Sequence, residues 1–154
     1  GPFLFVFVNG FFVYGGYGVL LGMGDRKRDN GLIYYPISLL FLVILYIKGA
    51  ISSEAILTGI LIMGWGDGLA ALIGSRWGKH TYKIYGKYKK SIEGTLVMLV
   101  AAFLVAYFFG GLSPLYSMIL AFVAICLENF TPLGFDNITV PIFSALLTEV
   151  LCRL

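Results

Sequence analysis

Apolar runs long enough to cross a lipid bilayer, separated by short connections, most constrain what this chain can fold into. They fall at residues 3–22, 32–47, 55–75, 94–110, 115–129 and 138–152, and a membrane helix needs roughly 17–25 residues. Only 12% of the 154 residues are charged, too few for the surface of a soluble domain. The sequence therefore predicts an all-α, polytopic integral membrane protein. We expect a single transmembrane catalytic domain over residues 1–154 with about six transmembrane helices; five spans are the alternative, because two runs are short.

Lysine and arginine are distributed unevenly among the connections. Arg26, Lys27 and Arg28 lie in 23–31, and the segment 76–93 is the most basic of the chain, whereas 110–114 has neither residue type. Because basic connections stay in the cytoplasm, 23–31 and 76–93 are predicted to be cytoplasmic. The connection 130–137 has no lysine or arginine, and the alternation of the helices is expected to place it on the same face. GMGD at 22–25 echoes GWGD at 64–67, which suggests three helical hairpins delivering acids to one site. A chance repeat is the alternative.

Asp67 is an acid inside the third apolar run, flanked by Gly66 and Gly68. A charge at such a depth costs roughly 2.5–3.5 kcal/mol and needs a metal ion, a cation or water as a partner. A hydrogen bond to a neighbouring helix is the alternative. The basic segment that follows could set the topology or bind anionic lipid heads. Together the two features indicate an ion site at the membrane surface.

The predicted cytoplasmic face carries the residue types that phosphoryl transfer needs. Carboxylates hold Mg²⁺ together with the nucleotide's phosphates, basic side chains bind phosphate oxygens, and glycine lets backbone amides approach. GSRWGKH at 74–80 is no P-loop, because it is one residue short and ends in His80. Cys126 and Cys152 lie in apolar runs without metal-ligand spacing and are expected to be structural thiols.

Two segments resemble a known family. GDGLAALIGSRWGKHTYKIYGKYKKSIEG, from Gly66, and ENFTPLGFDNITVPIFSALL, from Glu128, are similar to motifs of the membrane-bound CTP-dependent lipid kinases. These are dolichol kinase, phytol and farnesol kinases, and CTP-dependent diacylglycerol kinase. LIYYPISLLF resembles the family's span before the first motif. Family members are usually longer at the N-terminus, so the chain is expected to be truncated relative to them.

The resemblance implies an enzyme that moves the terminal phosphate of CTP to a lipid alcohol with Mg²⁺. The implied acceptors are a polyprenol or dolichol, a phytol-like prenol, or diacylglycerol, and the implied location is the cell membrane or the endoplasmic reticulum, with the active site facing the cytoplasm. The resemblance also implies the catalytic residues Asp67, Glu93 (a candidate base) and Asp136. Of these, Asp67 and Asp136 are expected to bind the metal. The expected nucleotide-binding residues are Gly66, Gly68, Gly74, Arg76, Lys79, Lys90, Ser91, Asn137, Arg26, Lys27 and Arg28.

Two other functions compete with the lipid kinase. The fold is related to that of the CTP-using phosphatidate cytidylyltransferases, so the resemblance leaves open which bond of CTP breaks. A non-catalytic transporter or lipid-binding scaffold is the third hypothesis, but a transporter would place acids along a path across the bilayer. Membrane lipids are expected partners, and nucleic acid is not.

Overall fold

Five helical rods and a small β-hairpin make up the described part of the chain. A computed structural model describes residues 31–84, 88–131 and 134–154. The first rod is α2 (Gly31–Ile47), and the second is continuous through α3 (Ser53–Leu61), the π-helix η2 (Ile62–Asp67) and α4 (Gly68–Trp77). The hairpin consists of β1 (Thr81–Ile84) and β2 (Tyr88–Ser91), and the remaining rods are α5 (Ile92–Phe108), α6 (Pro114–Phe130) and α7 (Asp136–Cys152).

The predicted helices are confirmed wherever the structure describes the chain. The expected runs 32–47, 55–75, 94–110, 115–129 and 138–152 each correspond to a helical rod whose ends lie within two residues of the expected ones. The first run, 3–22, lies outside the described residues. The rod 53–77 is long and apolar enough to cross a membrane, and α2, α5 and α6 are shorter apolar helices. The number of spans stays a prediction.

The described residues are mostly helical, consistent with the all-α prediction, and the connection 76–93 contains a small β-hairpin that was not predicted. In it, β1 and β2 pair antiparallel with Tyr82 opposite Lys90 and Lys83 opposite Lys89. Lys83 stands between Tyr82 and Ile84, and Tyr88 stands between Lys87 and Lys89, a period of two that is typical of a strand. Ser91 then ends the hairpin and begins α5, because its hydroxyl accepts a hydrogen bond from the Gly94 amide.

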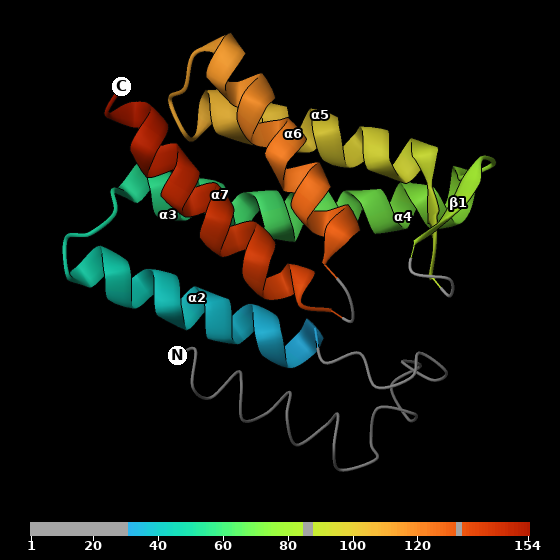
Figure 1. Ribbon diagram of the computed structural model, residues 1–154, viewed down its shortest axis with the longest axis horizontal. Helices are drawn as coiled ribbons and strands as arrows, with labels where there is room; N and C mark the ends of the chain where they lie inside the picture. Colours follow the sequence, from blue (N-terminus) through green and yellow to red (C-terminus); the bar gives the residue numbers. More distant parts are fainter. Residues whose placement is uncertain (1–30, 85–87, 132–133) are drawn as a thin grey trace.

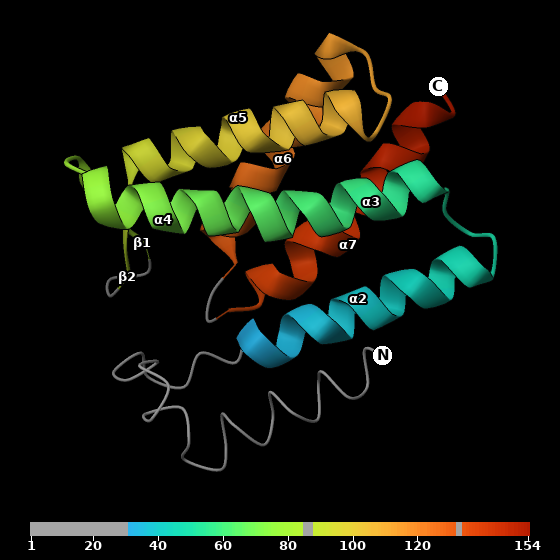
Figure 2. The ribbon, with the colours of Figure 1, turned by 180° about the vertical axis from the view of Figure 1, so that it is seen from behind.

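Helical rods that follow one another in the sequence run in opposite directions, and their buried residues form two clusters. The second rod packs along α5 and α7, α5 packs along α6, and α6 along α7 (Figures 1 and 2). The larger cluster contains Ile62, Met98, Leu120, Ala124 and Val140. Two of the three expected helical hairpins, 55–110 and 115–152, are therefore present as packed pairs of helices. The expected N-terminal helical hairpin includes residues outside the described part.

The helix ends sort into two groups. The start of α2, the β-hairpin, the end of α6 and the start of α7 lie toward one end of the molecule, whereas the α2–α3 and α5–α6 connections and the C-terminus lie toward the other (Figure 1). The hairpin, the end of α6 and the start of α7 therefore lie toward one end, as a shared face requires, and the cytoplasmic placement of that end stays a prediction. The motif segments at Asp67 and Asp136 can therefore meet.

Candidate active site

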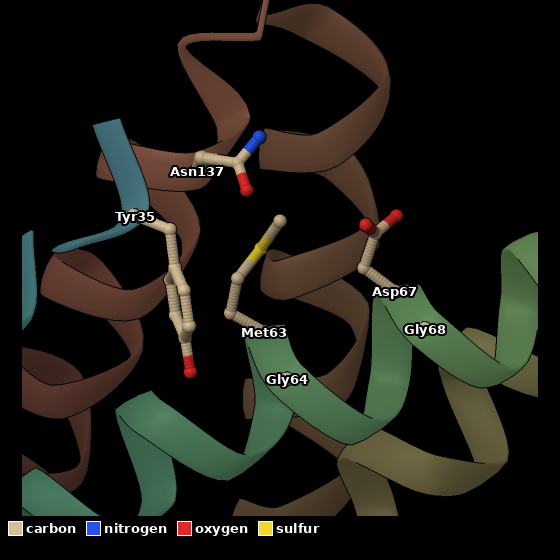
Figure 3. Close-up of a pocket in the computed structure, with 6 residues that line it drawn as sticks. All are labelled: Tyr35, Met63, Gly64, Asp67, Gly68 and Asn137. Carbon is tan, nitrogen blue, oxygen red and sulfur yellow. The ribbon is translucent and has the colours of Figure 1, made fainter. Parts of the chain in front are cut away.

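A pocket of about 210 Å³ joins the two motif segments. It is lined by Tyr35, Met63, Gly64, Asp67, Gly68 and Asn137. The side chains of Asp67 and Asn137 face it from η2 and α7, with Met63 between them (Figure 3). Asp67 stands ahead of the 10 residues of α4, so it lies about 15 Å from the end of its rod.

The backbone before Asp67 is a π-helix. In a π-helix each amide bonds five residues back, which turns the following side chains relative to an α-helix, and such segments occur often at functional sites. The hydroxyl of Tyr35 donates a hydrogen bond of 3.1 Å to the Ile60 carbonyl, just before η2 begins. It lies beside Gly64, where a Cβ would be 3.2 Å from the hydroxyl oxygen. Glycine at 64 therefore gives Tyr35 room against the π-helix.

The N-terminus of α7 forms the other wall. The Asn137 amide group donates to the Gly134 carbonyl and to Oδ1 of Asp136, both at 3.3 Å. The same Asp136 oxygen accepts the Asn137 backbone N–H at 3.1 Å. These contacts engage the Asn137 nitrogen and direct its Oδ1 toward the pocket (Figure 3). Tyr34 stacks on Phe135, with ring centroids 4.9 Å apart, and so joins α2 to this terminus.

The glycines expected at the nucleotide separate into two kinds. A Cβ on Gly66 would lie 2.6 Å from the Met98 sulfur, and one on Gly74 would lie 2.7 Å from the Ser91 hydroxyl. Both therefore allow close packing on α5. Gly68 is exposed, lines the pocket and has nothing within 4 Å of its Cβ position. Among these three, only Gly68 has free space at its Cβ position.

Lys90 is paired with an acid of the second motif segment. Its Nζ lies 2.6 Å from Oε1 of Glu128 and also donates to the Glu128 carbonyl at 3.1 Å. Glu128 is buried, with 6% of its side chain exposed, and Lys90 has 28% exposed. The expected phosphate ligand therefore holds the hairpin to the end of α6.

Glu93, in the first turn of α5, contacts the residues that precede β1. Its carboxylate lies 2.8 Å from Nδ1 of His80 and accepts the backbone N–H groups of Lys79 and His80. Its own backbone N–H and then the His80 side chain lower the pKa of Glu93 to about 2. A carboxylate of such low pKa is a weak base, so these contacts favour an anchoring role over proton abstraction.

The remaining nucleotide-binding candidates are exposed, buried or outside the described residues. Arg76 and Lys79 are exposed beside the end of α4 and leave their charged groups accessible to an anion. Ser91 is buried and caps α5, so its hydroxyl is engaged within the protein. Arg26, Lys27 and Arg28 lie outside the described residues.

Three features were missed at the sequence level. Tyr35 and Met63 line the pocket, and Glu128 is the partner of Lys90. Glu128 had a usable signal, because an acid in the apolar run 115–129 requires a partner for the reason applied to Asp67. Tyr35 stands in the resembling span next to Pro36, but nothing in the sequence shows that its hydroxyl reaches Ile60.

The pocket residues fit a magnesium ion that a phosphate ligand completes. Asp67 and Asn137 Oδ1 offer hard oxygen donors, and Mg²⁺ in nucleotide sites takes one or two protein carboxylates, with phosphates and water for the rest. No group of three or more histidine, cysteine, aspartate or glutamate side chains able to hold a metal occurs in the described ranges. A metal held by protein ligands alone therefore has no support there.

The described residues form a helical bundle with the apolar composition of a membrane protein. Its pocket contains an acidic side chain and lies toward one end of the bundle. The chain is 43% identical over 128 residues to phytol kinase of Synechocystis, and the aligned region covers 79% of the chain and 54% of that protein. It is 41% identical over 61 residues to dolichol kinase sec59 of Schizosaccharomyces pombe, covering 40% of the chain and 12% of the relative. With CTP-dependent diacylglycerol kinase 1 of the same yeast the identity is 26% over 146 residues, 84% of the chain and 64% of that protein.

These similarities support the CTP-dependent lipid kinase family, as the motifs indicated. Each of these three relatives is named as a kinase. The chain spans about half the length of the phytol kinase that it matches. No family model and no solved structure matches it significantly.

Proposed function

We propose that this chain is the catalytic region of a membrane kinase that transfers the γ-phosphate of CTP to the hydroxyl of a lipid alcohol. One observation carries the proposal: Asp67 and Asn137, from the two motif segments that resemble the family, face the same pocket. The name of CTP-dependent diacylglycerol kinase 1 supports CTP as the donor, and the names of the other relatives support a lipid alcohol as the acceptor.

Asp67 and the start of α7 would hold the metal. Asp67 and Asn137 Oδ1 supply ligands to Mg²⁺, and Asp136 fixes the amide of Asn137. Bound there, Mg²⁺ would neutralise charge on the phosphates. The N-terminus of α7 adds a favourable field for an anion. Asp136 itself is a second proposed metal ligand.

The phosphates of CTP would extend from the pocket toward the basic end of the molecule. Gly68 allows the phosphates to approach the backbone, and Arg76 and Lys79 bind the phosphate oxygens. Arg26, Lys27 and Arg28 remain proposed contacts on the strength of the resemblance. Lys90, Ser91 and Glu93 act on the site through the hairpin that their contacts hold.

The acceptor hydroxyl needs alignment more than a strong base. Phosphoryl transfer passes through a loose transition state in which positioning and charge stabilisation dominate. Glu93, with its pKa of about 2, is therefore not required as the base. The lipid tail would lie in the membrane, and the pocket would open on the cytoplasmic side, as the basic segment 76–93 predicts.

The decisive experiment follows the fate of the γ-phosphate. Protein in detergent or vesicles is given CTP labelled at the γ-position, Mg²⁺, and a panel of isoprenoid alcohols, diacylglycerol and phosphatidic acid. The proposal expects label on an alcohol and release of CDP. Release of pyrophosphate with cytidine attached to phosphatidic acid would instead establish the cytidylyltransferase. ATP and GTP in parallel reactions test the donor.

A further inference from the structure

The Lys90–Glu128 pair connects the two motif segments, although they are 38 residues apart. In the register of the hairpin, Tyr82 lies opposite Lys90 and Lys83 lies opposite Lys89. Side chains alternate between the two faces of a strand. The Tyr82 and Lys90 pair therefore shares one face, and the Lys83 and Lys89 pair shares the other.

The first of these faces is docked on the helices. The Tyr82 hydroxyl lies 2.5 Å from that of Thr95 on α5 and donates to Asn129 Oδ1 at 3.2 Å. Lys90 contacts Glu128, the residue next to Asn129. Lys83 and Lys89, on the opposite face, are both exposed. The hairpin thus has a docking face and a solvent face.

The surroundings of Glu128 make this contact demanding. One carboxylate oxygen pairs with Lys90, and the other, Oε2, is buried without a hydrogen-bond partner among the described residues. Lys90 also binds the Glu128 carbonyl, one of the last four carbonyls of α6, which lack partners within the helix. A buried carboxylate that loses its counter-charge is strongly unfavourable. If Lys90 left this position to bind a phosphate, the carboxylate of Glu128 would be buried without a counter-charge.

We propose that Glu128 is a positioning residue, and that Lys90 acts on the proposed kinase reaction by docking the basic hairpin on α6 rather than by binding phosphate. The inference rests on the proposed function. The ion pair holds the hairpin, and with it the turn that carries Lys79, against the end of the helix bundle. Lys90 and Glu128 thereby require each other, which makes the pair open to a suppressor test.

The experiment compares Lys90→Gln, Glu128→Gln and the double variant in the CTP assay. Lys90→Gln leaves Glu128 buried without its cation, and we expect kcat to fall about tenfold or more. Glu128→Gln should lower kcat less, because Lys90 is partly exposed and its hydrogen bond to the backbone carbonyl of residue 128 remains. The double variant should recover to within about threefold of the wild type, since no uncompensated charge remains. Lys90→Arg, which keeps the charge, should also retain activity.

Hydrogen exchange gives a readout that does not depend on catalysis. Backbone amides of 81–84 and 88–91 should exchange faster in Lys90→Gln and return toward wild-type protection in the double variant. Lys89→Gln, the same change on the solvent face, should leave their exchange unaltered. A double variant as inactive as Lys90→Gln, with normal hairpin protection in both, would overturn the inference and make Lys90 a direct ligand. An inactive wild type would instead refute the proposed function.

Discussion

Asp67 concentrates the chemistry of the proposed site in one residue. Asp67 lies in the interior of the apolar rod 53–77, away from both of its ends. It lines the pocket together with Asn137. Its position at the end of η2 gives it a direction that a regular α-helix would not give. Single substitutions that alter its charge or its direction should therefore affect activity with little effect on folding.

Asp67→Asn preserves the shape of the side chain and removes its charge. We expect activity to fall by about two orders of magnitude or more, while the protein still inserts into membranes and purifies normally. Glu54→Gln is the matched control, because Glu54 is exposed in the first turn of α3, far along the same rod. Retained activity in Asp67→Asn would reduce that residue to helix packing.

Tyr35→Phe keeps the ring and deletes the hydroxyl that binds Ile60. The variant loses this hydrogen bond just before η2, at a cost of about 0.5–1.5 kcal/mol. If η2 directs Asp67, the variant should require more Mg²⁺ for half-maximal activity. Tyr46→Phe, on the exposed end of α2, serves as the control. An unchanged Mg²⁺ requirement would separate Tyr35 from the metal site.

At the scale of elements, the junction of α4, the hairpin and α5 shows how closely two helices can pack. Gly74 and Gly94 face each other across it, and a Cβ on Gly74 would lie 3.5 Å from the Cα of Gly94. Ser91 fills the remaining space and caps α5. The same segment carries the basic residues, so its packing sets where they stand.

Gly68→Ala and Gly74→Ala should separate ligand approach from packing. Alanine at 74 meets the Ser91 hydroxyl, so we expect a loss of about 1–3 kcal/mol in the free energy of unfolding. Alanine at 68 meets nothing and should leave the melting temperature unchanged or slightly raised, while KM for CTP increases. Equal effects of the two substitutions on KM would contradict this division.

Glu93→Gln should make the stability of the hairpin less dependent on acid. The pKa of Glu93 is lowered from 4.5 to about 2 by its backbone and His80 contacts. The ionised carboxylate therefore stabilises the fold fully above pH 4.5, and this contribution disappears as the pH falls toward 2. Melting temperatures of wild type and variant should differ at pH 6 and converge on acidification. A constant difference would show that the charge is not responsible.

At the scale of the whole molecule, the bundle brings distant segments to one end. The hairpin, the end of α6 and the start of α7 lie toward the same side (Figures 1 and 2), although Tyr82 and Asn129, which are in contact, are 47 residues apart. A nucleotide is soluble in water and a lipid alcohol in the bilayer, so an enzyme using both needs its polar site at an interface. The proposed orientation puts that interface in the cytoplasm.

Single-cysteine labelling tests this orientation. In a Cys126→Ser/Cys152→Ser background, a probe that cannot cross the membrane should label Lys48→Cys from the outside. The same probe should label Lys83→Cys only after the membrane is permeabilised. Outside labelling of Lys83→Cys would reverse the topology and move the site away from cytoplasmic CTP.

The sequence by itself determined the helices, their ends and the two motif segments. Apolar runs with breaker residues between them report local chain chemistry, and they predicted every described helix to within two residues. The uneven distribution of lysine and arginine among the connections indicated one shared face. The acid at 67 needed a partner in any fold, so its importance could also be predicted.

Only the tertiary structure decided which polar residues face the pocket and which face each other. Lys90 and Glu93 have the same charges in either role, and their partners, Glu128 and His80, become known only when the hairpin is docked. Gly68 and Gly74 are equal in sequence, but only Gly74 lies against α5. Side-chain partners depend on contacts between distant segments, and these form when the helices pack.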